Sequence, residues 1–360
     1  MFDAAQIALF DIGAERLLLL PRDTAGTPAG ARIAAADALA DGAALILGPL
    51  FAGSVAAVAP LAKRAGVNVV AFSSDRRVAQ PGVFIMGFLF DQQLGRVIRF
   101  AIEQGLGRFA ALAPASDYGE TVVRELRKVT EATGSQIVDA VFYPVDTQGT
   151  SEIAAVVRTF ANYDARRNAL LAQRKWLTKR NDEVSREALR RLERFDTLGG
   201  THFDAVVLPE GGARLFTVAP LLAYYDVTPT EARLLGTSQW EEEAGALEQE
   251  PALVGGWFAA PPPEPRADFE ARFEALYGQP PPRLATLAYD AVALAGALVR
   301  LPGGPNLSAE ILTSRNGFRG VDGLFRFTPD GSNERGLAVL EVTRDGIVTV
   351  SAAPESLAGP

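Results

Sequence analysis

The sequence predicts an α/β protein with two doubly wound parallel sheets. Strand-like and helix-like segments alternate over residues 2–88 and again over residues 108–260 of the 360-residue chain. Regular alternation of this kind is typical of a parallel sheet with helices on both faces. Apolar residues make up 48% of the chain, which is enough for two hydrophobic cores.

Residues 43–75 form the clearest strand–helix–strand unit. An apolar strand over 43–47 stops at Gly48-Pro49, a helix follows with Ser54 as its expected N-cap, and a second strand covers 67–72. In open α/β sheets, ligands bind at the carboxyl ends of strands. Because the helix N-terminus there favours an anion, the unit predicts a place for a small carboxylate.

The other expected elements are read from periodicity and from turn residues. The first run contains helices at 2–10 and 28–40 and strands at 16–21 and 83–88. The second run contains helices at 91–104, 120–133 and 213–224 and strands at 108–113, 137–143, 204–208, 233–236 and 256–260. The last part contains helices at 267–277 and 284–299 and strand-like segments at 323–327, 338–343 and 347–350, with turns at 330–331 and 345–346.

Residues 158–196 interrupt the alternation with a highly charged stretch. It holds eleven basic and six acidic residues, which give it a net charge of +5. Since the whole chain has a net charge of −8, the rest of the chain has a net charge of −13. An apolar stripe and a turn at Asn181-Asp182 predict two antiparallel helices. Two interpretations stay open: a solvated helical hairpin, or a docking surface for an acidic partner or an anionic surface.

Composition excludes several classes of function. The net charge of −8 argues against nucleic-acid binding, and the absence of cysteine excludes disulfides and thiol catalysis. The single histidine, His202, argues against a metal site and against a Ser-His-Asp triad. We therefore expect no catalytic residues, no metal and no cofactor. The sequence contains neither a signal-peptide pattern at MFDAAQIALFDIG nor an apolar run long enough to span a membrane.

The loop sequences, in their order, resemble a known family. The matching segments are LILGPLFAGS, NVVAFSSD, ASDYGE, LPEGGA, LLGTSQW, LATLAYDAVALAGALV and FRGVDGLFRFTPDGSNERG. Together they resemble the type I periplasmic binding proteins of the leucine/isoleucine/valine-binding class, over most of the chain outside 158–196. Within that superfamily, LPRDT, ILGPLF, the charged hairpin and LPEGGARL are most similar to the penicillin-binding-protein activators.

The resemblance implies two lobes that close on a ligand by a hinge. It places three crossovers near residues 88–91, 259–263 and 317–322. Lobe 1 would then contain residues 1–89 and 262–318, and lobe 2 residues 90–261 and 319–360, with the charged insertion at 158–196. The family begins with a central strand that this sequence lacks, so we expect upstream residues in the natural protein or a truncated reading of its gene.

The family's ligand contacts in the interlobe cleft carry over to ten positions. These are Ala52, Gly53, Ser54, Ser73, Ser74, Tyr118, Glu210, Gly211, Gln239 and Trp240. Six of them have a purely structural alternative: the three serines as caps, Tyr118 and Trp240 as packing residues, and Glu210 as a charge at a helix N-terminus. The carboxylate for a ligand ammonium is either Glu210 or Glu241.

Two functions follow from the resemblance. The first is a non-enzymatic solute-binding protein for a small amino-acid-like ligand, which serves a membrane transporter. The alternative is an activator that contacts a peptidoglycan synthase and binds little or no solute. Both imply the periplasm or cell envelope, a protein that does not span the membrane and no nucleic-acid partner. An enzyme is disfavoured because no nucleophile–base pair or metal cluster is visible.

Overall fold

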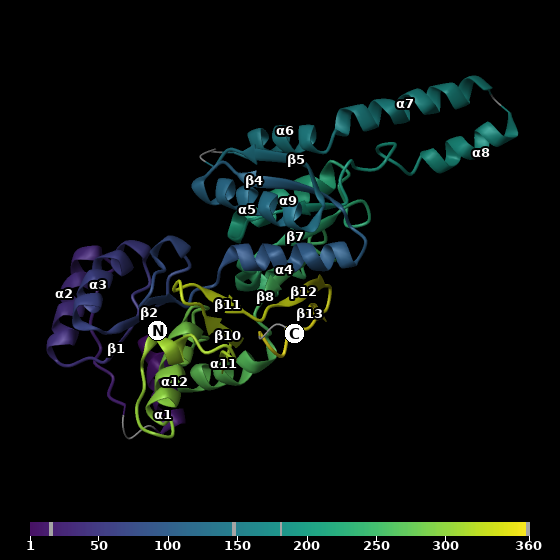
Figure 1. Cartoon of the computed structure of the whole chain (residues 1–360). Helices are drawn as coiled ribbons and strands as arrows, with labels where there is room; N and C mark the ends of the chain where they lie inside the picture. The colour runs from purple at the N-terminus through teal and green to yellow at the C-terminus, as the bar shows by residue number, and fades with distance from the viewer. Residues whose placement is uncertain (14–16, 146–148, 181, 358–360) are drawn as a thin grey trace. The chain divides into compact units, whose positions relative to one another are not determined.

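The computed structural model describes residues 1–13, 17–145, 149–180 and 182–357 (Figure 1). The chain divides into two compact units. Unit 1 contains Met1–Gln92, Pro261–Ala338 and Ala352–Pro360, and unit 2 contains Gln93–Ala260 and Val339–Ser351. Each unit has a parallel sheet with helices on both faces, which confirms the predicted fold class.

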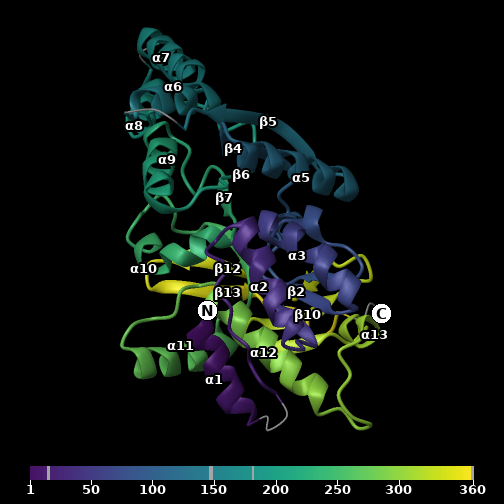
Figure 2. The ribbon, with the colours of Figure 1, turned by 90° about the vertical axis from the view of Figure 1, so that its left-hand side faces the viewer.

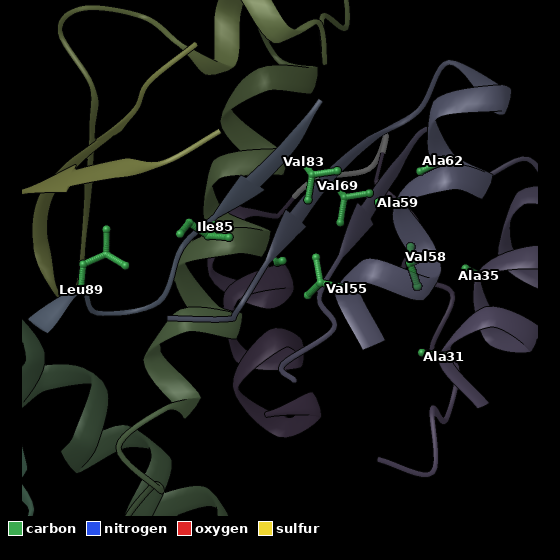
Figure 3. Close-up of a cluster of buried hydrophobic side chains, with 11 residues drawn as sticks. Ala31, Ala35, Val55, Val58, Ala59, Ala62, Val69, Val83, Ile85 and Leu89 are labelled. Carbon is green, nitrogen blue, oxygen red and sulfur yellow. The ribbon is translucent and has the colours of Figure 1, made fainter. Parts of the chain in front are cut away.

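The parallel sheet of unit 1 has the order β1 (Leu45–Leu47), β2 (Asn68–Ala71), β3 (Val83–Ile85). Successive side chains of a strand point to opposite faces, so the buried runs supply two cores. One face packs against α2 (Pro28–Ala40) and α3 (Ala52–Ala65), as Figure 3 shows. The other face, with Val70, Phe84 and Met86, packs against α12 (Ala285–Val299).

Helix α1 (Phe2–Ile12) lies against α12 and α11 (Glu264–Tyr277) in unit 1. Ile7 packs in one cluster with Phe269 and Phe273. A Cβ atom on Gly296 would lie 2.8 Å from the Ile12 side chain, so the glycine permits the close approach of α1 and α12. The unit also contains η1 (Arg76–Val78) and α13 (Ala309–Leu312).

A small antiparallel sheet completes unit 1. Unit 1 therefore extends to Ala338, beyond the expected lobe boundary at 319. The sheet consists of β9 (Phe318–Gly320), β10 (Gly323–Phe327) and β11 (Asn333–Arg335). Phe325 and Phe327 join the core beneath α12, and Phe327 lies 5.4 Å from Phe84 between ring centroids. This apolar burial keeps the segment up to residue 338 in unit 1.

Unit 2 has a seven-stranded sheet in the order β13-β12-β8-β7-β6-β4-β5. The bounds are β4 (Arg108–Pro114), β5 (Gln136–Tyr143), β6 (Ala205–Val207), β7 (Arg233–Gly236), β8 (Trp257–Ala260), β12 (Ala338–Thr343) and β13 (Gly346–Ser351). Strands β5, β4, β6, β7 and β8 pair in parallel, and β12 and β13 form the expected hairpin.

Helices lie on both sides of the unit 2 sheet. Figure 2 shows α5 (Asp117–Thr133) and α9 (Gly212–Tyr224) on opposite sides of β4 and β5. The remaining elements outside the charged stretch are α4 (Phe90–Glu103), α6 (Ser151–Phe160), η2 (Ser238–Glu243) and α10 (Ala244–Leu247). Helix α6 was not among the predicted elements.

The charged stretch forms α7 (Tyr163–Arg180) and α8 (Glu183–Leu192), which extend from unit 2 side by side (Figure 1). We call this helix pair the arm. The expected pair of helices is confirmed. The turn was predicted at Asn181-Asp182, and Asn181 lies outside the described residues. Asp182 caps α8 by accepting a hydrogen bond from the Ser185 N–H at 2.7 Å.

Two expectations for unit 1 were wrong. The strand predicted at 16–21 is absent from its described part: residues 17–21 are irregular, and Leu18 is 79% exposed. A strand needs a neighbour for its backbone hydrogen bonds, and β1 pairs only with β2 among the described residues. The N-cap of α3 is Phe51 and not Ser54, because Ala52 and Gly53 already belong to the first turn.

In the part of the chain that the structure describes, none of the helices has the length and apolar character needed to cross a lipid bilayer.

Truncation of Phe327 tests the role of β10 in the core of unit 1. Phe327 is 1% exposed, so Phe327→Ala should lower the free energy of unfolding by about 3–5 kcal/mol. Phe10 is 81% exposed, and Phe10→Ala should change it by less than about 0.5 kcal/mol. Chemical denaturation of the two variants measures both values; equal losses would contradict the described packing.

Candidate functional site

The sheet of unit 2 reverses its strand order at β4, which pairs with β5 on one side and β6 on the other. Pro114 at the end of β4 lies opposite Tyr143, the last residue of β5. Ala111 of β4 lies opposite Val207, the last residue of β6. In open α/β sheets, ligands bind outside the carboxyl ends of strands at such a reversal.

The loop after β4 brings Tyr118 to this edge. Ser116 caps α5 by accepting a hydrogen bond from the Gly119 N–H at 3.3 Å. A Cβ atom on Gly119 would lie 2.0 Å from the Pro114 carbonyl oxygen, so this tight start of α5 requires glycine. The Tyr118 hydroxyl lies 3.4 Å from Thr237 Oγ1, and burial raises the pKa of Tyr118.

Glu210 follows β6 and is the charged centre of the edge. Its side chain is 12% exposed, its Oε1 accepts a hydrogen bond from the Tyr143 hydroxyl at 2.5 Å, and Arg214 Nη1 lies 3.9 Å away. Burial raises the pKa of Glu210, and this effect exceeds the opposing effects of Tyr143, Arg214 and the Gly211 backbone. The protein therefore compensates the negative charge of Glu210 only in part.

The loop after β7 meets the loop after β6. A Cβ atom on Gly211 would lie 3.1 Å from Gln239 Cβ, and Gln239 itself is exposed. The Ser238 N–H donates to Gln93 Oε1 at 2.8 Å, which ties this loop to α4. The loop thus presents an amide side chain beside Glu210.

Trp240 supports the loop from below. The side chain is fully buried and its ring centroid lies 6.0 Å from that of Phe258. Cβ atoms on Gly236 and Gly256 would lie within 2.7 Å of the ring, so both positions need glycine for the ring to fit. Because other residues cover its ring completely, Trp240 does not contact a ligand directly in this structure and can act only by positioning those residues.

The structure therefore brings Tyr118, Glu210, Gly211 and Gln239 to one edge of unit 2. Prediction from the sequence missed four residues that contact these side chains or their loops: Gln93, Tyr143, Arg214 and Thr237. Two of them carried a usable signal, because Tyr143 ends a strand and Thr237 directly follows one. Glu241, the alternative carboxylate, lies further along in η2 and is partly buried.

The predicted residues of unit 1 lie at the carboxyl ends of β1 and β2. Ala52, Gly53 and Ser54 form the first turn of α3. Ser54 is fully buried, and its hydroxyl finds no hydrogen-bond partner within the described ranges. Ser73 is buried and accepts a hydrogen bond from the Asp75 N–H at 3.1 Å, whereas Ser74 is exposed.

These two strand ends are neighbours in unit 1. The Gly48 N–H donates to the Val70 carbonyl at 2.7 Å, and the Phe72 N–H donates to the Pro49 carbonyl at 3.0 Å. The arrangement offers backbone N–H groups and serine hydroxyls at one edge. Such groups suit a carboxylate or another small anion.

His202 lies away from both edges, half-exposed, with Nε2 3.6 Å from Asp139 Oδ2. No group of three or more histidine, aspartate or glutamate side chains that could hold a metal ion occurs among the residues described.

Comparisons with known proteins agree with this architecture. A family described as "Periplasmic binding protein" matches residues 1–346. No curated protein sequence matches the chain. Similar solved structures include a leucine binding protein from Thermotoga maritima, with 19% identity, a TM-score of 0.62 and coverage of 98% of this chain and 93% of that one.

Two other structures extend the comparison. A putative branched-chain amino acid ABC transporter protein from Rhodospirillum rubrum has 17% identity and a TM-score of 0.72, with 97% and 94% of the two chains covered. A solute binding protein of an ABC transporter from Rhodopseudomonas palustris, in complex with 3,4-dihydroxybenzoic acid, has 15% identity and a TM-score of 0.64, with 98% and 91% covered. At these identities the likeness concerns the fold.

The raised pKa of Glu210 predicts a pH-dependent stability. The folded state binds a proton on Glu210 more tightly than the unfolded chain does. The stability that this protonated carboxyl contributes is therefore full below about pH 4.3 and is lost as pH rises through the folded pKa. Glu210→Gln should therefore gain stability relative to the wild type between pH 4 and 7. Thermal unfolding across that range measures the difference.

Asp204, just before β6, provides a control of opposite sign. Its pKa is lowered, chiefly by the hydrogen bond from Arg108, so its contribution is present above about pH 3.9 and is lost as pH falls. Asp204→Asn should lose stability relative to the wild type as pH rises from 3 to 5. The same trend in both variants would contradict the described burial of Glu210.

Proposed function

Because the chain belongs to the periplasmic binding protein family, we propose that it binds a small amino-acid-like solute and does so without catalysing a reaction. The observation that carries the ligand class is the burial of the Glu210 carboxylate, which is 12% exposed, accepts a hydrogen bond from Tyr143 and has its nearest guanidinium, that of Arg214, 3.9 Å away. Solute-binding proteins need convergent polar groups that fix the ligand's orientation. The carboxyl-end edge of unit 2 has such groups.

Glu210 would receive the ligand's α-ammonium. Burial destabilises its ionised form more than the contacts with Tyr143, Arg214 and the Gly211 backbone stabilise it, so the pKa of Glu210 is raised. A ligand cation placed beside the carboxylate would supply the missing compensation and stabilise the ionised form. Tyr118 and Gln239, at the same edge, would add a hydroxyl and an amide for the rest of the ligand.

Unit 1 offers groups for an anion at its own edge. We propose Ala52, Gly53, Ser54, Ser73 and Ser74 as ligand contacts, because they lie at adjoining strand ends. The Ser54 hydroxyl is buried without a partner in the described part of the chain, so it has hydrogen-bonding capacity to offer. The N–H groups of the first turn of α3 favour a carboxylate.

The cellular role follows from the family. We propose that the protein acts in the periplasm and passes its solute to a membrane transporter. The structures from Rhodospirillum rubrum and Rhodopseudomonas palustris are described as parts of ABC transporters, which supports this role.

The second candidate is an activator that contacts a peptidoglycan synthase. The observation in its favour is the charged arm, which is large and projects from unit 2 (Figure 1). Deleting residues 166–194 should then abolish capture of a purified synthase and leave the folding of the remaining chain intact. Capture that survives the deletion would reject this candidate.

The ligand class is tested by pairs of compounds that differ only in the α-ammonium. Aliphatic, aromatic and polar amino acids are compared with the corresponding carboxylic acids, such as leucine with 4-methylpentanoate, by thermal shift and calorimetry. A bound amino acid at 100 times its Kd should stabilise the protein by about 2.7 kcal/mol. The matched acid should bind at least about 10-fold more weakly, since it leaves Glu210 uncompensated.

Glu210→Gln should remove this discrimination and leave binding of the acid unchanged. The matched control is Glu131→Gln, because Glu131 is an exposed residue near the other end of α5. It should bind both compounds like the wild type. Equal affinity of the wild type for both members of every bound pair would reject the ammonium role, and no binding of any compound would reject the solute-binding function.

A further inference from the structure

The first helix of the arm is uniformly basic over most of its length. From residue 165 to residue 180, α7 carries six basic and no acidic residues. They are Arg166, Arg167, Arg174, Lys175, Lys179 and Arg180. A cluster of lysine and arginine residues on a helix is typical of segments that meet anionic lipid headgroups.

Two of the six basic residues hold the arm in place. Arg166 is 6% exposed, donates to the Gly199 carbonyl at 2.9 Å and to the Asp226 carbonyl at 3.1 Å, and so fixes the base of α7. Arg174 donates to the carbonyls of Leu192 and Phe195 at 2.6 and 3.0 Å, which joins α7 to the end of α8. The arm is thus a braced element, and the other four basic residues are exposed.

The outward face of α7 combines positive charge with apolar surface. Leu170 and Leu177 are buried and mark the inner face of the helix. Lys175 and Lys179 lie four residues apart on the opposite face of the helix, and Leu171 lies at the flank between the two faces. Leu171 is 50% exposed, and both lysines are exposed and lack an ion-pair partner within the described residues.

Trp176 directly follows Lys175 and is 50% exposed. Arg180 lies over its ring at 4.8 Å from the centroid, an arrangement that presents a cation and an indole together. Val184, at the start of α8, is 80% exposed. Tryptophan beside arginine and lysine suits the boundary between lipid headgroups and acyl chains.

The acidic residues of the arm lie elsewhere and are partly neutralised. Asp164 pairs with Arg158, Asp182 with Arg180, and Glu187 with Arg190 and Arg191. The stretch 158–196 is positive by five charges in a chain that is otherwise negative by thirteen. The two exposed lysines of α7, which have no carboxylate partner within the described residues, fit a flat anionic surface better than a protein face of mixed charge.

We propose that the outward face of α7, formed by Lys175, Trp176 and Lys179, binds an anionic phospholipid surface. The lysines contact phosphate groups, and Trp176, with Arg180 over its ring, enters the interfacial region. The arm would hold the protein at the membrane without spanning it, and it would do so independently of the solute site.

Vesicles test the proposal on the whole chain. Vesicles of equimolar phosphatidylglycerol and phosphatidylcholine should sediment the protein at low ionic strength, and vesicles of phosphatidylcholine alone should not. Trp240 is fully buried and Trp257 is 6% exposed, so a blue shift of the emission on binding would report Trp176. The shift should be absent in Trp176→Phe, and binding should weaken as salt is added.

A matched pair of double variants locates the surface. Lys175→Gln with Lys179→Gln should lower the vesicle partition coefficient roughly 10- to 30-fold. Lys63→Gln with Arg64→Gln removes the same charge from exposed positions of α3 in unit 1 and should leave it unchanged. Circular dichroism and solute-induced stabilisation verify that each variant is folded.

Four outcomes would overturn the proposal. The first is absence of binding to the anionic vesicles, and the second is equal weakening in both double variants. The third is a blue shift of Trp176 with poly-glutamate but not with vesicles, which would assign the face to an acidic polypeptide. The fourth is concentration-dependent association without lipid that Lys175→Gln with Lys179→Gln abolishes, which would assign it to a second copy of the chain.

Discussion

Parallel pairing of β4 with both β5 and β6 is the constraint on which the candidate site of unit 2 depends. It aligns the ends of these strands, so Tyr118 and Glu210 emerge at one edge with Tyr143 beneath them. Glycines permit the close contacts that follow: Gly119 at the start of α5 and Gly211 against Gln239. A shift in the register of one strand would separate these groups.

The partly compensated charge of Glu210 connects this geometry with function. Burial makes ionisation costly, and the hydroxyl, guanidinium and backbone partners return only part of that cost. A site with such a residual cost distinguishes a ligand that brings a cation from one that does not. In the proposed site, selectivity would arise because a ligand without the cation leaves a buried polar group uncompensated.

Local sequence signals predicted much of the fold and the positions of many loop residues. The bounds of α2 and β7 agree with the prediction because proline, glycine and polar residues mark their ends. Long-range contacts could not be predicted: Phe325 and Phe327 keep residues 319–338 in unit 1, and the lack of a pairing partner leaves residues 17–21 irregular. For the same reason, Gln93 and Arg214 became visible as site residues only in three dimensions.

Calorimetry in buffers of different ionisation enthalpy tests the central claim most directly. If the ligand's ammonium compensates Glu210, binding lowers the pKa of that carboxyl, and the protein releases protons to the buffer near its raised pKa. The account predicts binding heats that change with the buffer's ionisation enthalpy in the sense of proton release, and a loss of that dependence in Glu210→Gln. Heats that are independent of the buffer, or that show proton uptake, would contradict it.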